Sequence, residues 1–448
     1  MRTFVALAFL CACGGQIDPV TADGGDAGKD AASKPDVVTV PDVVDSGPAP
    51  IGGVNVSDGG LGYQAEDQIA VAPDGTIAIL WTEILPTPPY VTMGYRFSTD
   101  DGKSFTPTQH ITVPATLFPG DPTITVDADG NFYAGLLAIH YNSQTADYSQ
   151  VYVARADKGS LSFGTPVEVS EPGNTTMLFD HPKIFVTSKG RILVGYASFA
   201  GMQAATAVGV VASSPDGVAW SRTEVVGQPE AAFANLFWFC EGKSSVYTTF
   251  LEATNADYFV GLRASTDDGQ TWSPSSTSVS LPGEPLAGLD PACVASGDDV
   301  WVMYTTTKKP SVDESTLDMA DAIRIAHSPN DGVSFDAKRG DALDTAQSKL
   351  AMIPILARES SGRLDVAYLA GDVDGDPNGS VRYDTVTGLA ATPSILVDAP
   401  LVFDTSRTAQ TWVGDYFGAV VHGGALFLAY PRNDQGASHI WFAKAALP

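Results

Sequence analysis

The chain has 448 residues, enough for several small domains or one large one. Its 52 acidic and 25 basic residues give a formal net charge of −27, which argues against nucleic acid and anionic lipid surfaces as partners because no basic stripe could neutralise phosphates. Many Gly, Pro, Ser, Thr and Val residues favour a turn-rich β protein, and no segment after the N-terminus is apolar for long enough to cross a bilayer.

Residues 1–13 have the pattern of an export signal. Arg2 precedes an apolar run from Phe4 to Leu10. The following Leu-Cys-Ala-Cys-Gly phrase resembles a bacterial lipobox, in which Cys13 would be lipidated and become the first mature residue. No Asp follows this cysteine, as in lipoproteins of the outer membrane, so we expect a lipid-anchored protein of the outer membrane or cell surface. An ordinary signal peptide is the alternative.

Residues 14–50 are predicted to form a disordered acidic tether. The segment is rich in Pro, Gly, Ala, Val and Asp, and it has no aromatic residue and no amphipathic period. Such a segment cannot bury enough apolar surface to offset the entropy lost on ordering. As a flexible coil it would span about 35 Å.

From residue 51 to 448 the sequence repeats a hairpin pattern. Residues 69–81, 124–137 and 184–196 each join two apolar strands through a short turn that ends in Gly. A third strand, a polar turn and a fourth strand follow. The pattern predicts an all-β domain of four-stranded antiparallel units.

A short phrase, S-x-D-x-G-x-x-aromatic, recurs in the turns before the fourth strands. A less regular copy runs from Ser213 to Trp220 with Pro215 at the acidic position. The residues that define the three regular copies are Ser98, Asp100, Gly102 and Phe105, then Ser265, Asp267, Gly269 and Trp272, and finally Ser328, Asn330, Gly332 and Phe335. Asp and Ser can bond backbone N–H groups of a tight turn, and Gly supplies the positive φ, so these residues are interpreted as structural.

The phrase resembles the Asp box of sialidase-like (BNR-repeat) β-propellers, and the spacing of the copies, roughly 50–60 residues, is typical of repeat arrays. This resemblance implies a propeller over residues 51–448. Counting hairpins predicts seven blades, and six, the number in sialidases, is the alternative. The last unit lacks a fourth strand, and residues 53–57 resemble one, so we expect the N-terminal strand to close the ring.

In such a propeller the starts of the first strands surround the central channel on the face that usually binds ligand. An Asp recurs at these starts, and a ring of them could bind a cation or sugar hydroxyls. Capping of the crossing loops by Asp is the structural alternative. Our candidates for the ligand face are Asp67, Asp121, Asp180, Asp290, Asp415, Tyr416, Arg407 and Arg432.

One loop has the spacing of a metal site. Asp372, Asp374 and Asp376 form D-x-D-x-D, whose alternating carboxylates could hold calcium. Pro377 stands where a calcium loop needs Gly, and Tyr383 stands where a bidentate Glu would close the loop. A polar hairpin loop in an acidic protein is therefore the alternative.

The resemblance to sialidases would imply three arginines that grip the substrate carboxylate, with a Tyr–Glu nucleophile pair and an Asp acid/base. The Phe/Tyr-Arg-Ile-Pro phrase of that family is absent. Four arginines lie on third strands, away from the expected ligand face, namely Arg96, Arg155, Arg263 and Arg324. Tyr416 and Glu66 could be imagined as a nucleophile pair, but no spacing selects them.

Two cysteines remain after the export signal. Aligning residues 236–240 with 289–293 puts Cys240 and Cys293 at the same place on neighbouring first strands. Because an exported protein leaves the reducing cytosol, we predict a disulfide, with two buried thiols as the alternative.

The sequence thus favours a non-catalytic, surface-tethered and monomeric lipoprotein that binds a glycan or an extracellular protein. A divergent, exo-sialidase-like glycoside hydrolase is the first alternative, and a structural component of the envelope is the second. No catalytic residue is assigned.

Overall fold

Short strands rich in Val, Ile, Phe and Tyr, joined by tight turns, make up the computed structural model of this chain. The described residues contain no helix that could span a membrane, and indeed none of them is helical. The structure describes residues 51–57, 62–142, 145–200, 206–227, 233–254, 258–287, 291–308, 320–358, 363–372, 379–402, 412–434 and 436–447. The export signal with Cys13 and the tether lie outside these ranges.

The first half of the described chain forms antiparallel sheets of four consecutive strands. Their strands are β2 (Tyr63–Val71), β3 (Ile77–Ile84), β4 (Val91–Ser98) and β5 (Gln109–Ile111), then β6 (Phe118–Val126), β7 (Phe132–Asn142), β8 (Thr145–Ala156) and β9 (Val167–Glu168), then β10 (Leu178–Val186), β11 (Ile192–Phe199), β12 (Ala207–Ser214) and β13 (Ser221–Val226), and then β14 (Phe233–Glu241), β15 (Val246–Ala253), β16 (Tyr258–Ser265) and β17 (Thr277–Ser278).

The second half contains a nine-stranded sheet and one more sheet of four strands. The strands of the large sheet are β18 (Cys293–Ser296), β19 (Asp299–Thr306), β20 (Ala322–Ser328), β21 (Gly340–Asp341), β22 (Leu350–Arg358), β23 (Leu364–Gly371), β24 (Gly379–Thr387), β25 (Ala390–Ala391) and β26 (Ile395–Leu401). The last sheet combines β1 (Val54–Asn55) with β27 (Gly418–His422), β28 (Ala425–Asp434) and β29 (Ala437–Ala446).

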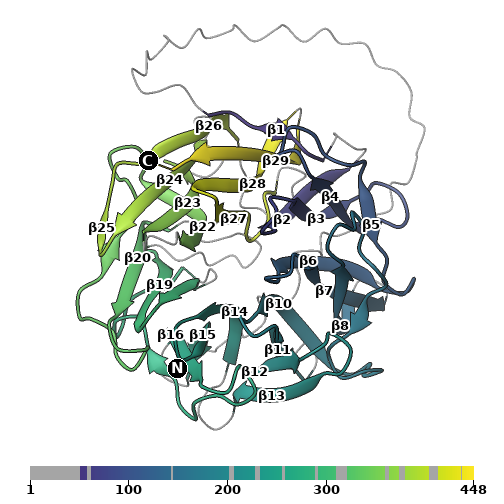
Figure 1. The fold of residues 1–448 in the computed structure, drawn as a ribbon, viewed down its shortest axis with the longest axis horizontal. Helices are drawn as coiled ribbons and strands as arrows, with labels where there is room; N and C mark the ends of the chain where they lie inside the picture. The colour runs from purple at the N-terminus through teal and green to yellow at the C-terminus, as the bar shows by residue number, and fades with distance from the viewer. Residues whose placement is uncertain are drawn as a thin grey trace, which may run out of the picture.

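The sheets follow one another around a centre, as Figure 1 shows. The first strands of neighbouring sheets contact each other, β2 with β6 and β27, β6 with β10, and β10 with β14. A single parallel pair, Asp341 with Ala390, merges the units β18–β21 and β22–β26 into the nine-stranded sheet. The number of blades, seven or six, stays a prediction.

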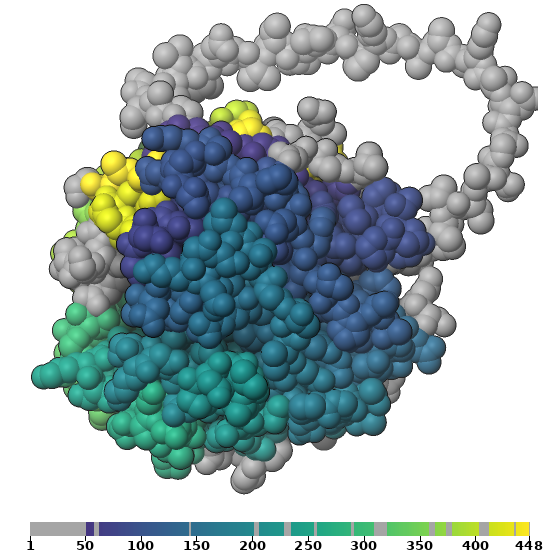
Figure 2. Space-filling model, turned by 45° about the vertical axis from the view of Figure 1, so that its right-hand side comes forward, coloured from purple at the N-terminus to yellow at the C-terminus, as the bar shows by residue number. Residues whose placement is uncertain are grey.

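The first and last described strands belong to the same sheet. β1 pairs with β29 in antiparallel register, Val54 opposite Phe442 and Asn55 opposite Trp441. In the oblique view of Figure 2 the purple N-terminal residues lie against the yellow C-terminal ones. The apolar core lies between adjacent sheets, where Ile77 and Trp81 pack in one cluster with Phe427.

The recurring S-x-D-x-G phrases form turns after the third strands. Ser98 Oγ donates to Asp100 Oδ1 at 2.9 Å and accepts from Gly102 N at 3.0 Å, while Asp100 accepts from Ser104 N at 2.9 Å. These hydrogen bonds, chiefly those from Ser104, lower the pKa of Asp100 to about 2. The role of the phrase is therefore to hold a turn.

Equivalent bonds recur in the two other regular copies. Ser265 Oγ donates to Asp267 and accepts from Gly269 N, both at 2.8 Å. Asn330 replaces the Asp without loss of the key contact, because its Oδ1 accepts from Ser334 N at 3.1 Å. Of the closing aromatics, Phe105 packs on Phe442 of the neighbouring sheet, Trp272 packs on Phe239 of its own sheet, and Phe335 packs on the cluster around Cys240 and Leu262.

The fourth copy differs from the alignment made on the sequence. Ser214, not Ser213, accepts from Gly217 N at 2.8 Å. Asp216, not residue 215, then accepts from the N–H groups of Val218 and Ala219. The alignment on Gly217 was therefore wrong by one residue at the Ser and the Asp, because this turn reaches its Gly one residue sooner.

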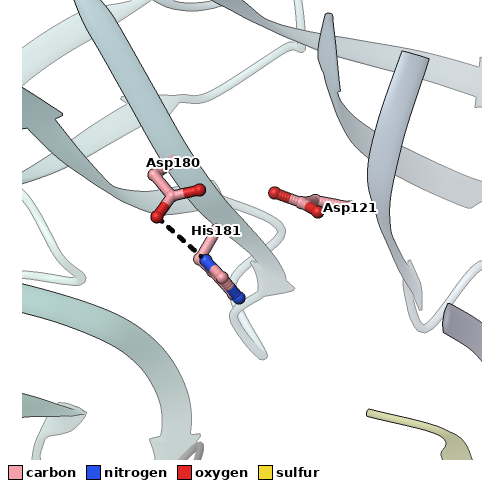
Figure 3. A group of neighbouring side chains, drawn as sticks. All are labelled: Asp121, Asp180 and His181. Atoms are coloured by element: carbon pink, nitrogen blue, oxygen red, sulfur yellow. Dashed lines mark ion pairs between the residues drawn. The ribbon is translucent and has the colours of Figure 1, made fainter. Parts of the chain in front are cut away.

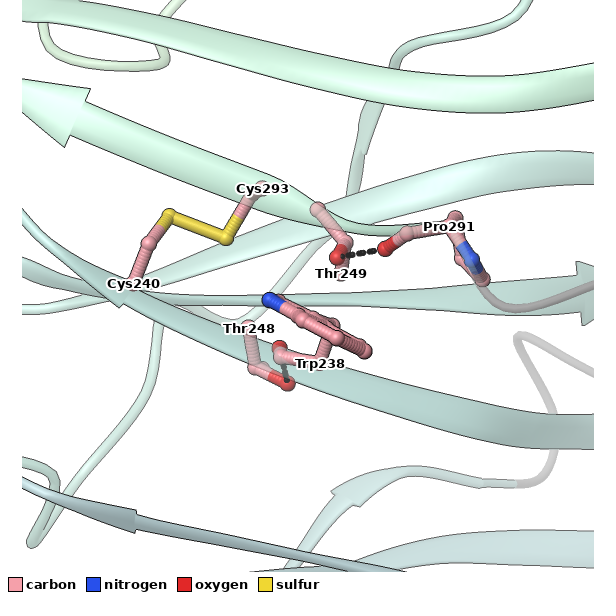
Figure 4. The surroundings of a disulfide bond; sticks show 6 residues. All are labelled: Trp238, Cys240, Thr248, Thr249, Pro291 and Cys293. Carbon is pink, nitrogen blue, oxygen red and sulfur yellow. Dashed lines mark hydrogen bonds between the residues drawn. A yellow bond between two sulfur atoms is a disulfide. The ribbon is translucent and has the colours of Figure 1, made fainter. Parts of the chain in front are cut away.

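Cys240 and Cys293 are joined by a disulfide between β14 and β18, with their Cα atoms 5.7 Å apart. Figure 4 shows its surroundings, where Thr249 Oγ1 donates to the carbonyl of Pro291 and Thr248 Oγ1 donates to that of Trp238. The bridge thus links the innermost strands of two adjacent units. The hydrogen bond from Thr249 to Pro291 also connects these two units.

Candidate functional site

Each of several first strands carries a β-bulge at the same place. In β2, β6 and β10 the register shifts between Ala65 and Gln68, between Gly120 and Thr123, and between Asp180 and Lys183. The residue inside each bulge has positive φ: 54° at Glu66, 47° at Asp121 and 47° at His181. Bulges commonly redirect side chains next to functional sites. Here they bring three ionisable side chains from three sheets into one cluster.

The acidic cluster consists of Glu66, Asp121, Asp180, His181 and Asp415. His181 Nδ1 lies 3.1 Å from Asp180 Oδ2, and its Nε2 lies 4.0 Å from Asp415 Oδ2. Ligand atoms of Asp121, Asp180 and His181 all lie within 4.8 Å of one another. Figure 3 shows the carboxylates of Asp121 and Asp180 pointing toward each other from β6 and β10.

Asp415 reaches the cluster because Gly414 passes very close to β2. Gly414 has φ +94°, and a Cβ at this position would lie 2.6 Å from the backbone nitrogen of Glu66. Only glycine combines that conformation with so close an approach. The segment before β27 thereby adds a fourth carboxylate from the far end of the chain.

All members of the acidic cluster are buried: Glu66 and Asp180 are fully inaccessible, and His181 is 8% exposed. Thr82 Oγ1 donates to Glu66 Oε2 at 3.1 Å, and Asn235 Nδ2 donates to Asp180 Oδ2 at 2.9 Å. The other oxygens, Glu66 Oε1, Asp121 Oδ2 and Asp180 Oδ1, have no hydrogen-bond partner in the described part of the chain.

Burial and repulsion from neighbouring carboxylates shift Glu66 and Asp121 toward their neutral forms. Burial, followed by the charges of Asp121 and Asp415, raises the pKa of Glu66 well above its ordinary value. Burial is also the largest cause that raises the pKa of Asp121 to about 7, against the lowering effect of His181. The charged groups behind both shifts are carboxylates and His181, and no described arginine is among them.

The ring of aspartates expected from the sequence is only partly assembled. Asp121, Asp180 and Asp415 do meet. Asp67 instead accepts from Gly418 N at 3.2 Å, and its pKa is raised well above the ordinary value by burial. Its neighbour Glu66 takes the place expected for it. The sequence pattern suggests Glu66 only as an imagined partner of Tyr416, and it does not single out His181.

The remaining candidate residues for the ligand face and the metal site do not lie together. Tyr416 lies beside the acidic cluster, its ring centroid 6.5 Å from that of His181. Arg432 binds Asp398 Oδ2 at 2.7 Å and stacks on Trp441 at 4.4 Å, so its charge is used within the fold. Asp372 is near the surface, 3.4 Å from Lys349 Nζ. Asp290, Asp374, Asp376 and Arg407 lie outside the described residues.

The first strands also line a partly open central cavity of about 200 Å³. Its walls are the apolar parts of β2, β6, β10, β14, β22 and β27, with Lys183 and Trp238 among them. Lys183 Nζ lies 3.6 Å from the centre of a Trp238 ring and 3.3 Å from Gln68 Oε1. A second cavity of about 10 Å³ touches both His181 and Lys183.

No protein-family model matches the chain, and no curated protein matches it either. Solved structures do match. A protein of unknown function from Dyadobacter fermentans has a TM-score of 0.54 and 15% identity, over 89% of this chain and 99% of its own. A Hadza microbial sialidase, Hz136, has a TM-score of 0.53 and 13% identity, over 88% and 68%. A phage phi92 endosialidase has a TM-score of 0.52 and 9% identity, over 88% and 69%.

At these identities the likeness concerns the fold. The domain is all-β, five of the six sheets in the described residues are four-stranded and antiparallel, and its structural neighbours include sialidases. The sialidase-like β-propeller fold expected from the sequence is confirmed.

Proposed function

We propose that this chain is a non-catalytic binding protein whose propeller holds a glycan that carries no carboxylate, over the face that contains the acidic cluster. The observation that supports the proposal is the convergence of carboxyl groups in the acidic cluster without a described arginine beside them. Four carboxylates converge where the first strands start, and the perturbing charges on Glu66 and Asp121 include no described arginine. An anionic sugar would be repelled there, whereas hydroxyl groups would be accepted.

The class of ligand is suggested by the neighbours. Two of the solved structures that share the fold are named as a sialidase and an endosialidase. Fold alone does not carry function, so the choice of glycan rests on this analogy together with the polarity of the face.

The proposal includes anchoring to the bacterial outer membrane or cell surface through lipid on Cys13. The lipobox-like phrase before Gly14 and the polar composition of residues 14–50 support it. Mass spectrometry of the mature protein should find a lipidated N-terminal Cys13, and Cys13→Ser should move the protein from the membrane to the soluble fraction. An unmodified mature N-terminus elsewhere would contradict anchoring without affecting the glycan proposal.

A glycan array probed with the purified protein tests the binding function. We expect binding to neutral glycans and none to their sialylated counterparts. A fluorogenic sialoside should not be turned over. Selective binding of sialylated glycans, or sialoside turnover that Arg407→Ala abolishes, would overturn the proposal.

A divergent glycoside hydrolase is the second candidate, because Glu66 is a buried carboxyl with a raised pKa beside other carboxylates, the usual environment of a general acid. Hydrolysis of neutral aryl glycosides that Glu66→Gln abolishes would support this candidate against the first. Thr82→Val, which removes only the hydrogen bond to Glu66, would serve as the control for local packing.

A further inference from the structure

We propose that Asp121, Asp180 and His181 bind a divalent transition-metal ion, with Zn²⁺ and Mn²⁺ as the fitting ions. Glu66 and Asp415 would be its nearest carboxylate neighbours. The inference goes beyond the glycan-binding function, and it concerns only the interior of the acidic cluster.

The geometry brings one donor from each of these three side chains together. Their ligand atoms lie within 4.8 Å of one another, and they come from the bulges of two adjacent first strands, β6 and β10. Three donors about 2.0–2.2 Å from one metal ion lie roughly 3.3–3.8 Å apart in tetrahedral or trigonal geometry. Because the three ligand atoms lie within 4.8 Å of one another, a contraction of up to about 1.5 Å would complete the site.

Oxygens without hydrogen-bond donors are a second and independent reason. Asp121 Oδ2 and Asp180 Oδ1 are buried without a donor, although Asp121 is only 3% exposed and Asp180 is inaccessible. Glu66 Oε1 is also buried without a hydrogen-bond donor among the described residues. Leaving a buried charged acceptor unsatisfied is expensive, and a cation between Asp121 and Asp180 would satisfy both at once.

Asp398, another buried carboxylate of the chain, shows how donors of the fold can satisfy such a group. Asp398 is 3% exposed, and its Oδ2 accepts from Tyr430 Oη at 2.8 Å and from Arg432 at 2.7 Å. The fold thus supplies donors to a carboxylate that it buries for structural reasons. Across the gap between Asp121 and Asp180 the facing groups are instead two acceptors (Figure 3).

The donor set selects the kind of ion. An imidazole nitrogen favours first-row transition metals, whereas calcium and magnesium prefer oxygen ligands throughout. Two aspartates would neutralise a divalent charge, and three protein ligands leave room for water in a fourth position. The cavity of about 10 Å³ beside His181 is the size of one water molecule.

Metal binding by full-length protein without a polyhistidine tag tests the proposal directly. After treatment with EDTA, we expect one equivalent of Zn²⁺ or Mn²⁺ to bind in calorimetry and to raise the melting temperature. Asp121→Asn, Asp180→Asn and His181→Gln should each weaken binding at least tenfold. Each variant is first checked for native circular dichroism.

His327→Gln is the matched control, since His327 lies near the surface between Asp299 (2.7 Å) and Asp336 (3.0 Å) and could bind the same ions. Asp372→Asn controls for the separate acidic loop. Binding that persists in all three cluster variants, or that disappears in either control, would overturn the proposal.

If the cluster variants do not fold, metal binding by the wild-type protein still tests the proposed site. Co²⁺ should bind stoichiometrically with visible absorption typical of a nitrogen and oxygen site of four or five ligands, and Zn²⁺ should displace it. Absence of any stoichiometric ion from wild-type protein, with no thermal shift, would refute the site. Because no glycan is present, this failure would leave the glycan proposal untouched.

Discussion

The backbone of Val54 lies directly opposite that of Phe442, so the first described strand completes the sheet that the last three strands begin. The contact continues beyond the strand itself. Ser57 Oγ accepts from Ile440 N at 3.0 Å and donates to Gln64 Oε1 at 3.1 Å, within a site where Ser57 is 3% exposed. One hydroxyl therefore connects β1, β2 and β29.

Removing that hydroxyl should weaken the closure. Ser57→Ala leaves a buried N–H group without its acceptor, and we expect it to lower the free energy of unfolding by about 1–3 kcal/mol in urea titrations. Val54→Thr is the control, because Val54 is half exposed and the change should stay within about 0.5 kcal/mol. Equal effects of the two substitutions would argue against a role of Ser57 in closure.

Gly102 gives a second test of the contact between the first and last sheets. It has φ +79°, and a Cβ there would lie 2.1 Å from Phe442 Cε1. Gly75 has a similar φ, +88°, with nothing within 4 Å. Gly75→Ala should cost about 1–2 kcal/mol for the backbone conformation alone, and Gly102→Ala should cost about 1–3 kcal/mol more through overpacking. Equal melting temperatures for the two variants would contradict the packing.

The disulfide between Cys240 and Cys293 closes a loop with a sequence separation of 53. Loss of chain entropy in the unfolded state predicts that Cys240→Ala with Cys293→Ala lowers the free energy of unfolding by roughly 4 kcal/mol. Guanidinium unfolding of oxidised protein checks the value. In an unreduced digest the peptides that contain the two cysteines should be found linked, and their recovery as separate alkylated thiols would disprove the bridge.

The acidic cluster should make the metal-free protein less stable as the pH rises. Burial raises the pKa of Asp121 to about 7 from its ordinary value of 3.8, so the folded state binds this proton more tightly than the unfolded state. The stability that results is complete below about pH 4 and is lost as the pH rises through 7. Glu66 shifts in the same direction, and Asp180, His181 and Asp415 are the other ionisable groups that face Asp121.

Urea titrations in EDTA at pH 5.5 and pH 8 measure this effect. We expect wild type to lose more stability than Asp121→Asn between the two values, by an amount on the order of 1–3 kcal/mol, given about 1.4 kcal/mol per pKa unit. Repulsion within the highly acidic chain acts on both proteins alike. Identical losses in the two proteins would show that Asp121 does not titrate in this range.

Several structural features of this protein could be predicted from the sequence, because they depend on residues close together in the chain or at matching points of the repeat. The bonds of Ser98, Asp100 and Gly102 lie within one turn, so their spacing alone was enough to predict that turn. Short apolar segments joined by turns that end in Gly predicted the all-β class, since this pattern is typical of β-hairpins. The position of Cys240 and Cys293 at matching points of the repeat indicated which two residues could meet.

The acidic cluster was decided by the tertiary structure. A bulge shifts the alternation by one residue, so Glu66 enters the cluster and Asp67 does not, and no local pattern marks where that shift occurs. His181 and Asp415 meet only because β10 and the segment before β27 converge at the centre. Arg432 is held by Asp398 and Trp441, partners whose proximity depends on how β26, β28 and β29 pack. Contacts between residues so far apart in the chain come from the closed arrangement of sheets, which spacing in the sequence does not encode.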